Sequence, residues 1–124
     1  MSKLVLSTLP HTWLIDIDGT MLEHNGHKAE GDKLLPNVKA FWSQIASQDI
    51  IVLLSARTSS ETAETLDFLK SAGLRFDHVL FNLPTGERIL INDNKPSGLK
   101  TAISINLTRD QGFSDVELII DENL

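Results

Sequence analysis

The stretch Trp13-Leu14-Ile15-Asp16-Ile17-Asp18-Gly19-Thr20 decides the fold that we predict for this chain. It begins with an uninterrupted apolar run and then changes to acidic residues, a glycine and a threonine. Apolar runs without polar alternation are typical of strands that are covered on both faces of a parallel sheet. Three more such runs follow along the chain, namely Ile50 to Leu54, Val79 to Phe81 and Ile89 to Ile91. We therefore expect four strands of a mainly parallel sheet.

Two amphipathic helices are predicted between the first three runs. Pro36 suits the first position of a helix, and an apolar stripe with helical spacing follows it: Val38, Phe41, Trp42 and Ile45. For the second helix, Thr58 and Glu61 have capping-box spacing, and Gly73 lies where a C-terminal glycine stop belongs. Alternating strands and helices indicate an α/β fold with right-handed crossovers.

The second half of the chain departs from this alternation. Asn82 to Arg88 is too short for a helical crossover, so we expect a turn or an irregular link there. Ala102 to Leu107 has apolar residues at period two and is predicted to be an edge strand. For Ser114 to Leu124 we favour a helix, with a strand over Val116 to Ile120 as the alternative.

Composition bounds the class of protein. A chain of 124 residues that is 41% hydrophobic fits one domain, placed at 1–124. The formal charge of −6 argues against nucleic acid as a partner, because a phosphate backbone requires a basic face. The absence of cysteine excludes disulfides and thiolate chemistry. No apolar run is long enough to span a membrane and Met1 to Pro10 does not resemble a signal peptide, so a cytoplasmic location is expected.

Polar residues follow three of the predicted strands at the point where each strand ends. These segments are Asp16 to Thr20, Ser55 to Arg57 and Asn92 to Lys95. Because ligands bind at the carboxyl ends of parallel strands, we expect these segments to meet at one edge of the sheet. Their clustered carboxylates would repel one another without a cation, and Mg²⁺ prefers oxygen ligands of this kind. A bound Mg²⁺ would also let an acidic protein accept a phosphate.

The chemistry of these residue types predicts a phosphoryl-transfer site. Asp16 is the candidate nucleophile, because a carboxylate can attack phosphorus and form an acyl phosphate. Asp18 is the candidate general acid and base. The phosphoryl oxygens would be bound by the loop residues Gly19 and Thr20, and by Ser55 with the adjacent backbone amide of Ala56. Lys95 would offset the charge that builds in the transition state.

The sequence allows a second role for each of three side chains. Ser55 taken alone would be a strand-ending serine that caps local backbone groups. Arg57 would contact substrate or serve as a salt-bridge partner. Lys95 competes with Lys100 and Arg88 for the role of the positively charged catalytic residue. Arg88 would begin the strand of Ile89 to Ile91 and lie about 15 Å from Asp93, at a strand rise of about 3.3 Å per residue.

The motifs resemble those of the haloacid dehalogenase-like phosphatase superfamily. Asp16 to Thr20 resembles the first motif, Ile50 to Ser55 the second, and Ile89 to Asp93 the metal-binding fourth motif. The resemblance implies a three-layer Rossmann-like fold, Mg²⁺, and phosphomonoester hydrolysis through an aspartyl phosphate. It also implies Mg²⁺ ligation by Asp16, the backbone carbonyl of Asp18, and Asp93.

The chain departs from this family pattern at two positions. Asn92 stands where the fourth motif often carries an acid, and no base lies near Leu83, where the third-motif lysine is expected. Lys95 is our replacement for that lysine. Within the superfamily, the small size and the stretch from Phe76 to Asp93 are most similar to short bacterial phosphatases associated with capsule or surface polysaccharide synthesis.

The segment 21–33 is predicted to be a flap, with Gly26 and Gly31 as hinges and with His24 and His27 near the substrate entrance. No stretch is long enough for an inserted cap domain, so we expect an open, capless site and a homo-oligomer. The expected function is Mg²⁺-dependent hydrolysis of a small phosphorylated metabolite, most plausibly a sugar phosphate of carbohydrate metabolism. The alternatives are a phosphatase that acts on a protein or nucleic-acid end, and a catalytically attenuated binding module with the same fold.

Overall fold

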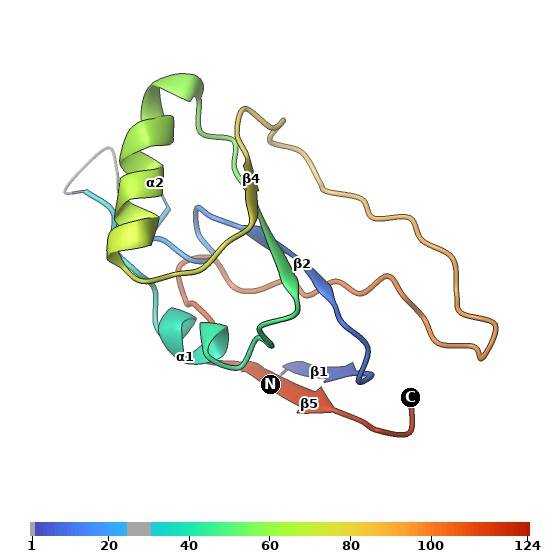
Figure 1. Cartoon of the computed structure of the whole chain (residues 1–124). Helices are drawn as coiled ribbons and strands as arrows, with labels where there is room; N and C mark the ends of the chain where they lie inside the picture. Colours follow the sequence, from blue (N-terminus) through green and yellow to red (C-terminus); the bar gives the residue numbers. More distant parts are fainter. Residues whose placement is uncertain (1, 25–30) are drawn as a thin grey trace.

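Figure 1 shows the computed structural model, which describes residues 2–24 and 31–124. The described strands form two parallel sheets, one with the order β2-β3-β4 and one that pairs β1 with β5. They are β1 (Ser2–Leu6), β2 (Thr12–Asp16), β3 (Ile50–Leu54), β4 (His78–Leu80) and β5 (Val116–Ile120). Helix α1 (Val38–Trp42) lies between β2 and β3 in the chain, and helix α2 (Thr62–Ser71) between β3 and β4. Parallel strands joined through helices define an α/β domain.

The sheet β2-β3-β4 confirms the first three predicted strands. β2 pairs with β3 from Thr12 opposite Ile50 to Asp16 opposite Leu54. On one face of β3 the alternate residues Ile51 and Leu53 are fully buried, whereas the residues between them are only half-buried. Because the strands are parallel, this register brings Asp16 to the same edge of the sheet as the residues that follow β3.

The predicted capping signal is confirmed at a short 3₁₀ helix, η2 (Ser59–Glu61), which leads directly into helix α2. The Thr58 backbone N–H donates to Oε1 of Glu61 at 3.3 Å, and the Thr58 hydroxyl donates to the same oxygen at 3.1 Å. Gly73 follows the helix with a φ of +77°, the left-handed conformation that favours glycine. The buried residues Thr65 and Leu69 hold this helix against the core (Figure 1).

Helix α1 confirms the first predicted helix, but it begins at Val38 with Asn37 as its N-cap, so the placement of Pro36 at the first helical position is wrong. The helix ends at Trp42, so Ile45 of the apolar stripe is buried beyond it. The aromatic rings of this region pack against the C-terminal part of the chain. The Phe41 and Phe113 ring centroids lie 4.6 Å apart, and Trp42 meets Phe113 edge-on. At Gly112, with a φ of +71°, an added Cβ would lie 2.2 Å from the Pro36 carbonyl oxygen, so this contact requires glycine.

The C-terminal segment is a strand, so the favoured helix over Ser114 to Leu124 is wrong and its strand alternative is confirmed. β5 pairs with β1 from Ser2 opposite Val116 to Leu6 opposite Ile120. The sequence interpretation did not include β1, although its buried leucines at period two are a weak strand signal. Each segment satisfies the backbone hydrogen bonds of the other, which neither could do alone.

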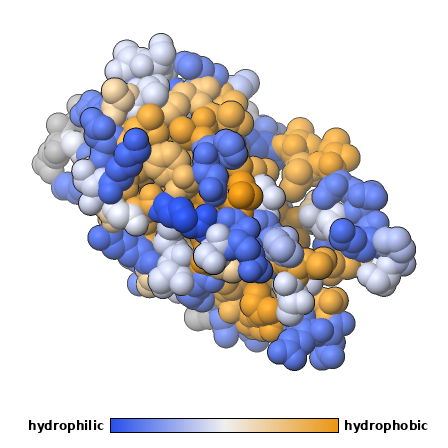
Figure 2. Space-filling view, in the orientation of Figure 1, coloured by the Kyte–Doolittle hydropathy of each residue, from blue (hydrophilic) through white to orange (hydrophobic). Residues whose placement is uncertain are grey.

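Most of the segment 84–107 lies away from the compact part of the molecule, and the segment contains no strand (Figure 1). Near its end, Ile105 and Leu107 pack against the core. The strands predicted at Ile89 to Ile91 and Ala102 to Leu107 are therefore wrong. Ile89 is 82% exposed and Ile91 is 89% exposed. A run of three residues forms a strand where a neighbouring strand pairs with it, as β3 does with β4, so the tertiary structure decides its position. Hydrophobic residues consequently contribute to the molecular surface (Figure 2).

The described ends of the predicted flap 21–33 pair with each other. Leu22 and Leu34 form an antiparallel bridge, and the Glu23 N–H donates to the Lys33 carbonyl at 3.1 Å. Met21 and Leu22 are fully buried, so these first two residues of the predicted flap belong to the core. Gly26 and His27 lie outside the described residues. Within residues 2–24 and 31–124 there is no helix with the length and apolarity needed to cross a membrane.

Candidate active site

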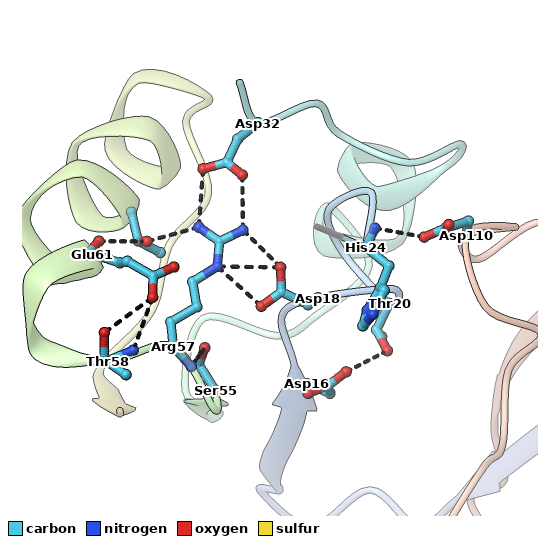
Figure 3. A network of polar contacts seen from close by, with 11 residues as sticks. Asp16, Asp18, Thr20, His24, Asp32, Ser55, Arg57, Thr58, Glu61 and Asp110 are labelled. Carbon is cyan, nitrogen blue, oxygen red and sulfur yellow. Dashed lines mark hydrogen bonds and ion pairs between the residues drawn. The ribbon is translucent and has the colours of Figure 1, made fainter. Parts of the chain in front are cut away.

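Asp16 is the last residue of β2, and its carboxylate has two partners from distant parts of the chain. Its Oδ1 accepts a hydrogen bond from Nη1 of Arg88 at 2.6 Å. Its Oδ2 accepts one from the Thr20 hydroxyl at 3.1 Å (Figure 3). The Asp16 and Arg88 side chains are both about one-third exposed, at 36% and 35%. The candidate nucleophile is thus fixed in orientation and remains accessible to solvent.

The loop after Asp16 turns tightly, as its sequence predicts. Three successive backbone N–H groups, from Thr20 to Leu22, donate to the Ile17 carbonyl. Gly19 has a φ of +83°, and an added Cβ would lie 3.2 Å from Cγ of Arg109, so glycine is needed here. The Gly19 N–H donates to the Leu22 carbonyl at 2.7 Å. This amide is therefore occupied, and the prediction that it faces a phosphoryl oxygen does not match the observed turn.

Asp18 lies on the other side of the loop, where it meets Arg57 (Figure 3). Nε of Arg57 donates to both Asp18 oxygens, and Nη2 donates to Oδ1 at 2.7 Å. Arg57 also binds Asp32 through two nearly parallel bonds of 2.8 and 3.0 Å. Of the two roles considered for Arg57, the structure supports the salt-bridge partner.

The Arg57 side chain is only 2% exposed, so its charge needs compensation within the protein. Burial by itself lowers the pKa of Arg57, but the hydrogen bonds and negative charges of Asp32 and Asp18 outweigh it and raise the pKa above its ordinary value. The guanidinium therefore stays charged. A buried cation between two carboxylates leaves the group with one net negative charge beside the Asp16 loop.

Ser55 and Ala56 follow β3 and lie near this group in the chain. The Ser55 side chain is buried, and its hydroxyl accepts the Arg57 N–H at 3.0 Å. This contact is the local backbone cap that is the alternative to phosphate binding by Ser55. Ala56 is exposed at the same edge of the sheet. Ser55 thus shapes the turn that delivers Arg57, and the exposed Ala56 remains the predicted backbone contact for a phosphoryl oxygen.

Asp93, Lys95 and Lys100 lie in the exposed segment 84–107. The Thr101 hydroxyl donates to the Asp93 carbonyl, and the Lys95 N–H donates to the Leu99 carbonyl at 2.9 Å in a local turn. Among the contacts of the described residues, none joins the side chain of Asp93, Lys95 or Lys100 to Asp16, whose partners are Arg88 and Thr20, so the predicted convergence is not seen. The reason is that the convergence required a strand at Ile89 to Ile91, which the structure does not contain.

Arg88 occupies the position beside the nucleophile that sequence reasoning gave to Lys95. The argument against Arg88 assumed that it begins a parallel strand and lies far from the carboxyl edge. Without that strand, the irregular link after β4 lets Arg88 reach Asp16 directly. The cation at this site is therefore Arg88.

Sequence reasoning missed two further contributions. Asp32 precedes Lys33 in an ordinary polar stretch, and no local pattern distinguishes it as a partner of Arg57. Asp110 holds the Asp16 loop from the C-terminal side, because its Oδ1 accepts the His24 N–H at 2.7 Å and its own N–H donates to the Gly19 carbonyl at 2.9 Å. Asp110 has a φ of +64°, and an Asp followed by Gly112 two residues later is a turn signal that could have suggested a close approach.

The oxygen atoms of Asp16 and Asp18 fit a bound Mg²⁺ only in part. Asp16 and the backbone carbonyl of Asp18 are oxygen ligands at one strand end, which is the chemistry that Mg²⁺ prefers. Among the residues that the structure describes, no three His, Asp or Glu side chains gather around one point. Asp93, the predicted third ligand, does not join Asp16 and Asp18.

A hollow of about 200 Å³ lies away from this edge and is lined in part by His11, Trp13 and Asp49, at the amino-terminal end of β2 and β3. There Asp49 accepts the Trp13 indole N–H at 3.0 Å and the His11 backbone N–H at 3.0 Å. These contacts join the starts of two strands, which is a structural role.

Comparison with known proteins gives no match: no family model, no curated protein and no solved structure resembles this chain closely enough to be assigned.

Proposed function

We propose that this chain is a Mg²⁺-dependent phosphomonoesterase of the haloacid dehalogenase-like superfamily, with a capless, three-layer Rossmann-like fold. One observation carries the proposal. Two carboxylates two residues apart lie at the carboxyl end of the parallel strand β2, Asp16 as its last residue and Asp18 just beyond it, and each is oriented by its own arginine. A nucleophile and a separate acid/base group are the two functions that covalent phosphoryl transfer requires.

In the first chemical step an Asp16 carboxylate oxygen attacks phosphorus. The bond between phosphorus and the ester oxygen breaks, and that oxygen takes the proton held by Asp18 as the alcohol departs. The Arg88 guanidinium, 2.6 Å from Oδ1 of Asp16, is placed to offset negative charge on the phosphoryl oxygens. The product of this step is an aspartyl phosphate on Asp16.

In the second step a water molecule attacks the same phosphorus. Asp18, now deprotonated, accepts a proton from that water, and the bond between phosphorus and Asp16 breaks to release inorganic phosphate. Throughout, the negative charges of Asp16 and of the phosphoryl group would be offset by Mg²⁺ held by Asp16 and the Asp18 carbonyl. Asp16 returns to its starting carboxylate.

A small phosphorylated metabolite, most plausibly a sugar phosphate, is the proposed substrate. The open edge around Asp16 also admits a phosphorylated protein or nucleic-acid end, although the net charge of −6 disfavours nucleic acid. A catalytically attenuated binding module is the second candidate function. It is favoured by one observation, that the Asp16 carboxylate is paired with Arg88 and Thr20 rather than placed beside Asp93 around one ion.

Hydrolysis of an aryl phosphate tests the proposal and separates it from the binding module. We expect wild-type turnover with Mg²⁺, loss of turnover with EDTA, and a loss of at least about 10³-fold in Asp16→Asn. Asp115→Asn, a change at an exposed aspartate near β5, is the matched control and should keep full activity. Equal rates for wild type and Asp16→Asn would refute the mechanism, and phosphate binding without turnover would support the binding module. A panel of phosphorylated sugars, nucleotides and peptides then ranks the substrate classes.

A further inference from the structure

Arg57 has more hydrogen bonds than a simple ion pair requires. A guanidinium carries five N–H donors, and all five of Arg57 are engaged within the protein. Nε and one N–H of Nη2 bind Asp18, the second N–H of Nη2 and one of Nη1 bind Asp32, and the last binds the Thr65 hydroxyl at 2.8 Å. No donor remains for a substrate, so Arg57 acts on the reaction only through its partners.

The anchors of Arg57 are rigid. The Asp32 side chain is 3% exposed, and Thr65 is fully buried in helix α2. The Thr65 hydroxyl accepts from Arg57 and donates onward to the Glu61 carbonyl at 2.8 Å. The guanidinium plane is therefore set by helix α2 and by Asp32, independently of Asp18.

The two Asp18 oxygens are held unequally. Oδ1 accepts from Nη2 at 2.7 Å and from Nε at 3.2 Å, whereas Oδ2 accepts only from Nε at 3.0 Å. A carboxylate oxygen has two lone-pair positions, so Oδ2 keeps an open position while Oδ1 is filled. The Asp18 side chain is 18% exposed, which leaves that open position accessible.

We propose that Arg57, fixed by Asp32 and Thr65, is a positioning residue that holds the Asp18 carboxyl group so that the open lone-pair position of Oδ2 is the one that exchanges a proton with the ester oxygen. This inference rests on the proposed phosphatase function. It assigns proton transfer to one atom of the acid/base residue and adds two side chains, Arg57 and Asp32, that never touch the substrate.

The proposal predicts a dependence on the leaving group. An alkyl alkoxide is a poor leaving group and needs protonation, whereas a nitrophenolate departs without it. Arg57→Lys keeps the positive charge but loses the planar fork that fixes Asp18. For Arg57→Lys we expect kcat/KM to fall about 10²-fold with a sugar phosphate and less than about threefold with nitrophenyl phosphate. The measured quantity is the kcat/KM for the sugar phosphate divided by the kcat/KM for nitrophenyl phosphate, because kcat/KM reports the first chemical step.

Arg75→Lys is the matched control. Arg75 also binds a carboxylate and two backbone carbonyls, but it does so near the amino-terminal ends of β3 and β4. A loss of stability alone should act equally on both esters, so Arg75→Lys should leave the ratio unchanged. Asp32→Asn tests the positioning role of Arg57 if Arg57→Lys does not fold. This variant keeps the Arg57–Asp18 bonds, and it should lower the ratio of the two kcat/KM values about tenfold.

The outcomes are distinguishable. A wild-type protein that hydrolyses neither ester refutes the phosphatase function and the positioning role together. An active wild type whose Arg57→Lys and Asp32→Asn variants lose activity equally on both esters refutes the positioning role alone. An equal rise in KM for both esters would show that Arg57 binds the phosphoryl group, which also overturns the proposal.

Discussion

Two regions of this molecule have similar sequences, but one forms a strand and the other does not. Ile50 to Leu54 and Ile89 to Ile91 are both apolar runs followed by polar residues. The first is β3, the central strand of its sheet, with Leu53 fully buried. The second lies in an exposed segment, with Ile91 89% exposed. The difference teaches that an apolar run forms a strand when a partner strand lies beside it, as β2 and β4 lie beside β3.

The same contrast separates the candidate site residues. Asp16, Asp18, Ser55 and Arg57 are attached directly to β2 and β3, and the structure brings them to one edge. Asp93 and Lys95 depend on the second region and remain outside that edge. Arg88 is the exception, because its long side chain reaches Asp16 from the beginning of the exposed segment.

The largest expected effect concerns stability. Leu53→Ala should lower the free energy of unfolding by about 2–5 kcal/mol, because it removes buried atoms and leaves a cavity at the centre of the sheet. Ile91→Ala should change it by less than about 0.5 kcal/mol, because that side chain is exposed. Urea denaturation followed by circular dichroism measures both. Comparable losses would show that Ile91 is buried in solution and that the two regions are alike.

The next effect concerns the cation beside the nucleophile. Arg88→Ala should reduce kcat/KM for an aryl phosphate about 10²-fold, since it removes the charged hydrogen bond to Asp16. Lys95→Ala, a matched change in the exposed segment, should cost less than about threefold. Steady-state kinetics of the two variants decides between them. A larger loss from Lys95→Ala would restore the assignment based on sequence alone.

The smallest expected effect is at Asp93. From the observed geometry, Asp93→Asn should change kcat/KM by less than about threefold and leave the Mg²⁺ concentration for half-maximal activity unaltered. Titration of activity with Mg²⁺ measures both quantities. A large increase in the Mg²⁺ requirement would instead place Asp93 at the metal, and segment 84–107 would then have to fold against β2 during turnover.

Much of the site could be predicted because its signals are local. The apolar run before Asp16 predicts β2, and the Thr58 and Glu61 spacing predicts the start of helix α2. The partners of these residues could not be predicted in the same way. Asp32 and Arg88 carry no distinguishing pattern, and each meets its partner only after the chain has folded back over more than 20 residues.

The sequence by itself determined the three strands β2, β3 and β4, the tight glycine turn after Asp16 and the two carboxylates that define the proposed chemistry. Each of these follows from neighbouring residues through backbone conformation and hydrophobic periodicity. Only the tertiary structure decided that β1 pairs with β5, that Arg88 stands beside Asp16, and that Arg57 lies between Asp18 and Asp32. The physical reason is that pairing of strand edges and of charges depends on which distant segments meet, and local patterns do not encode that choice.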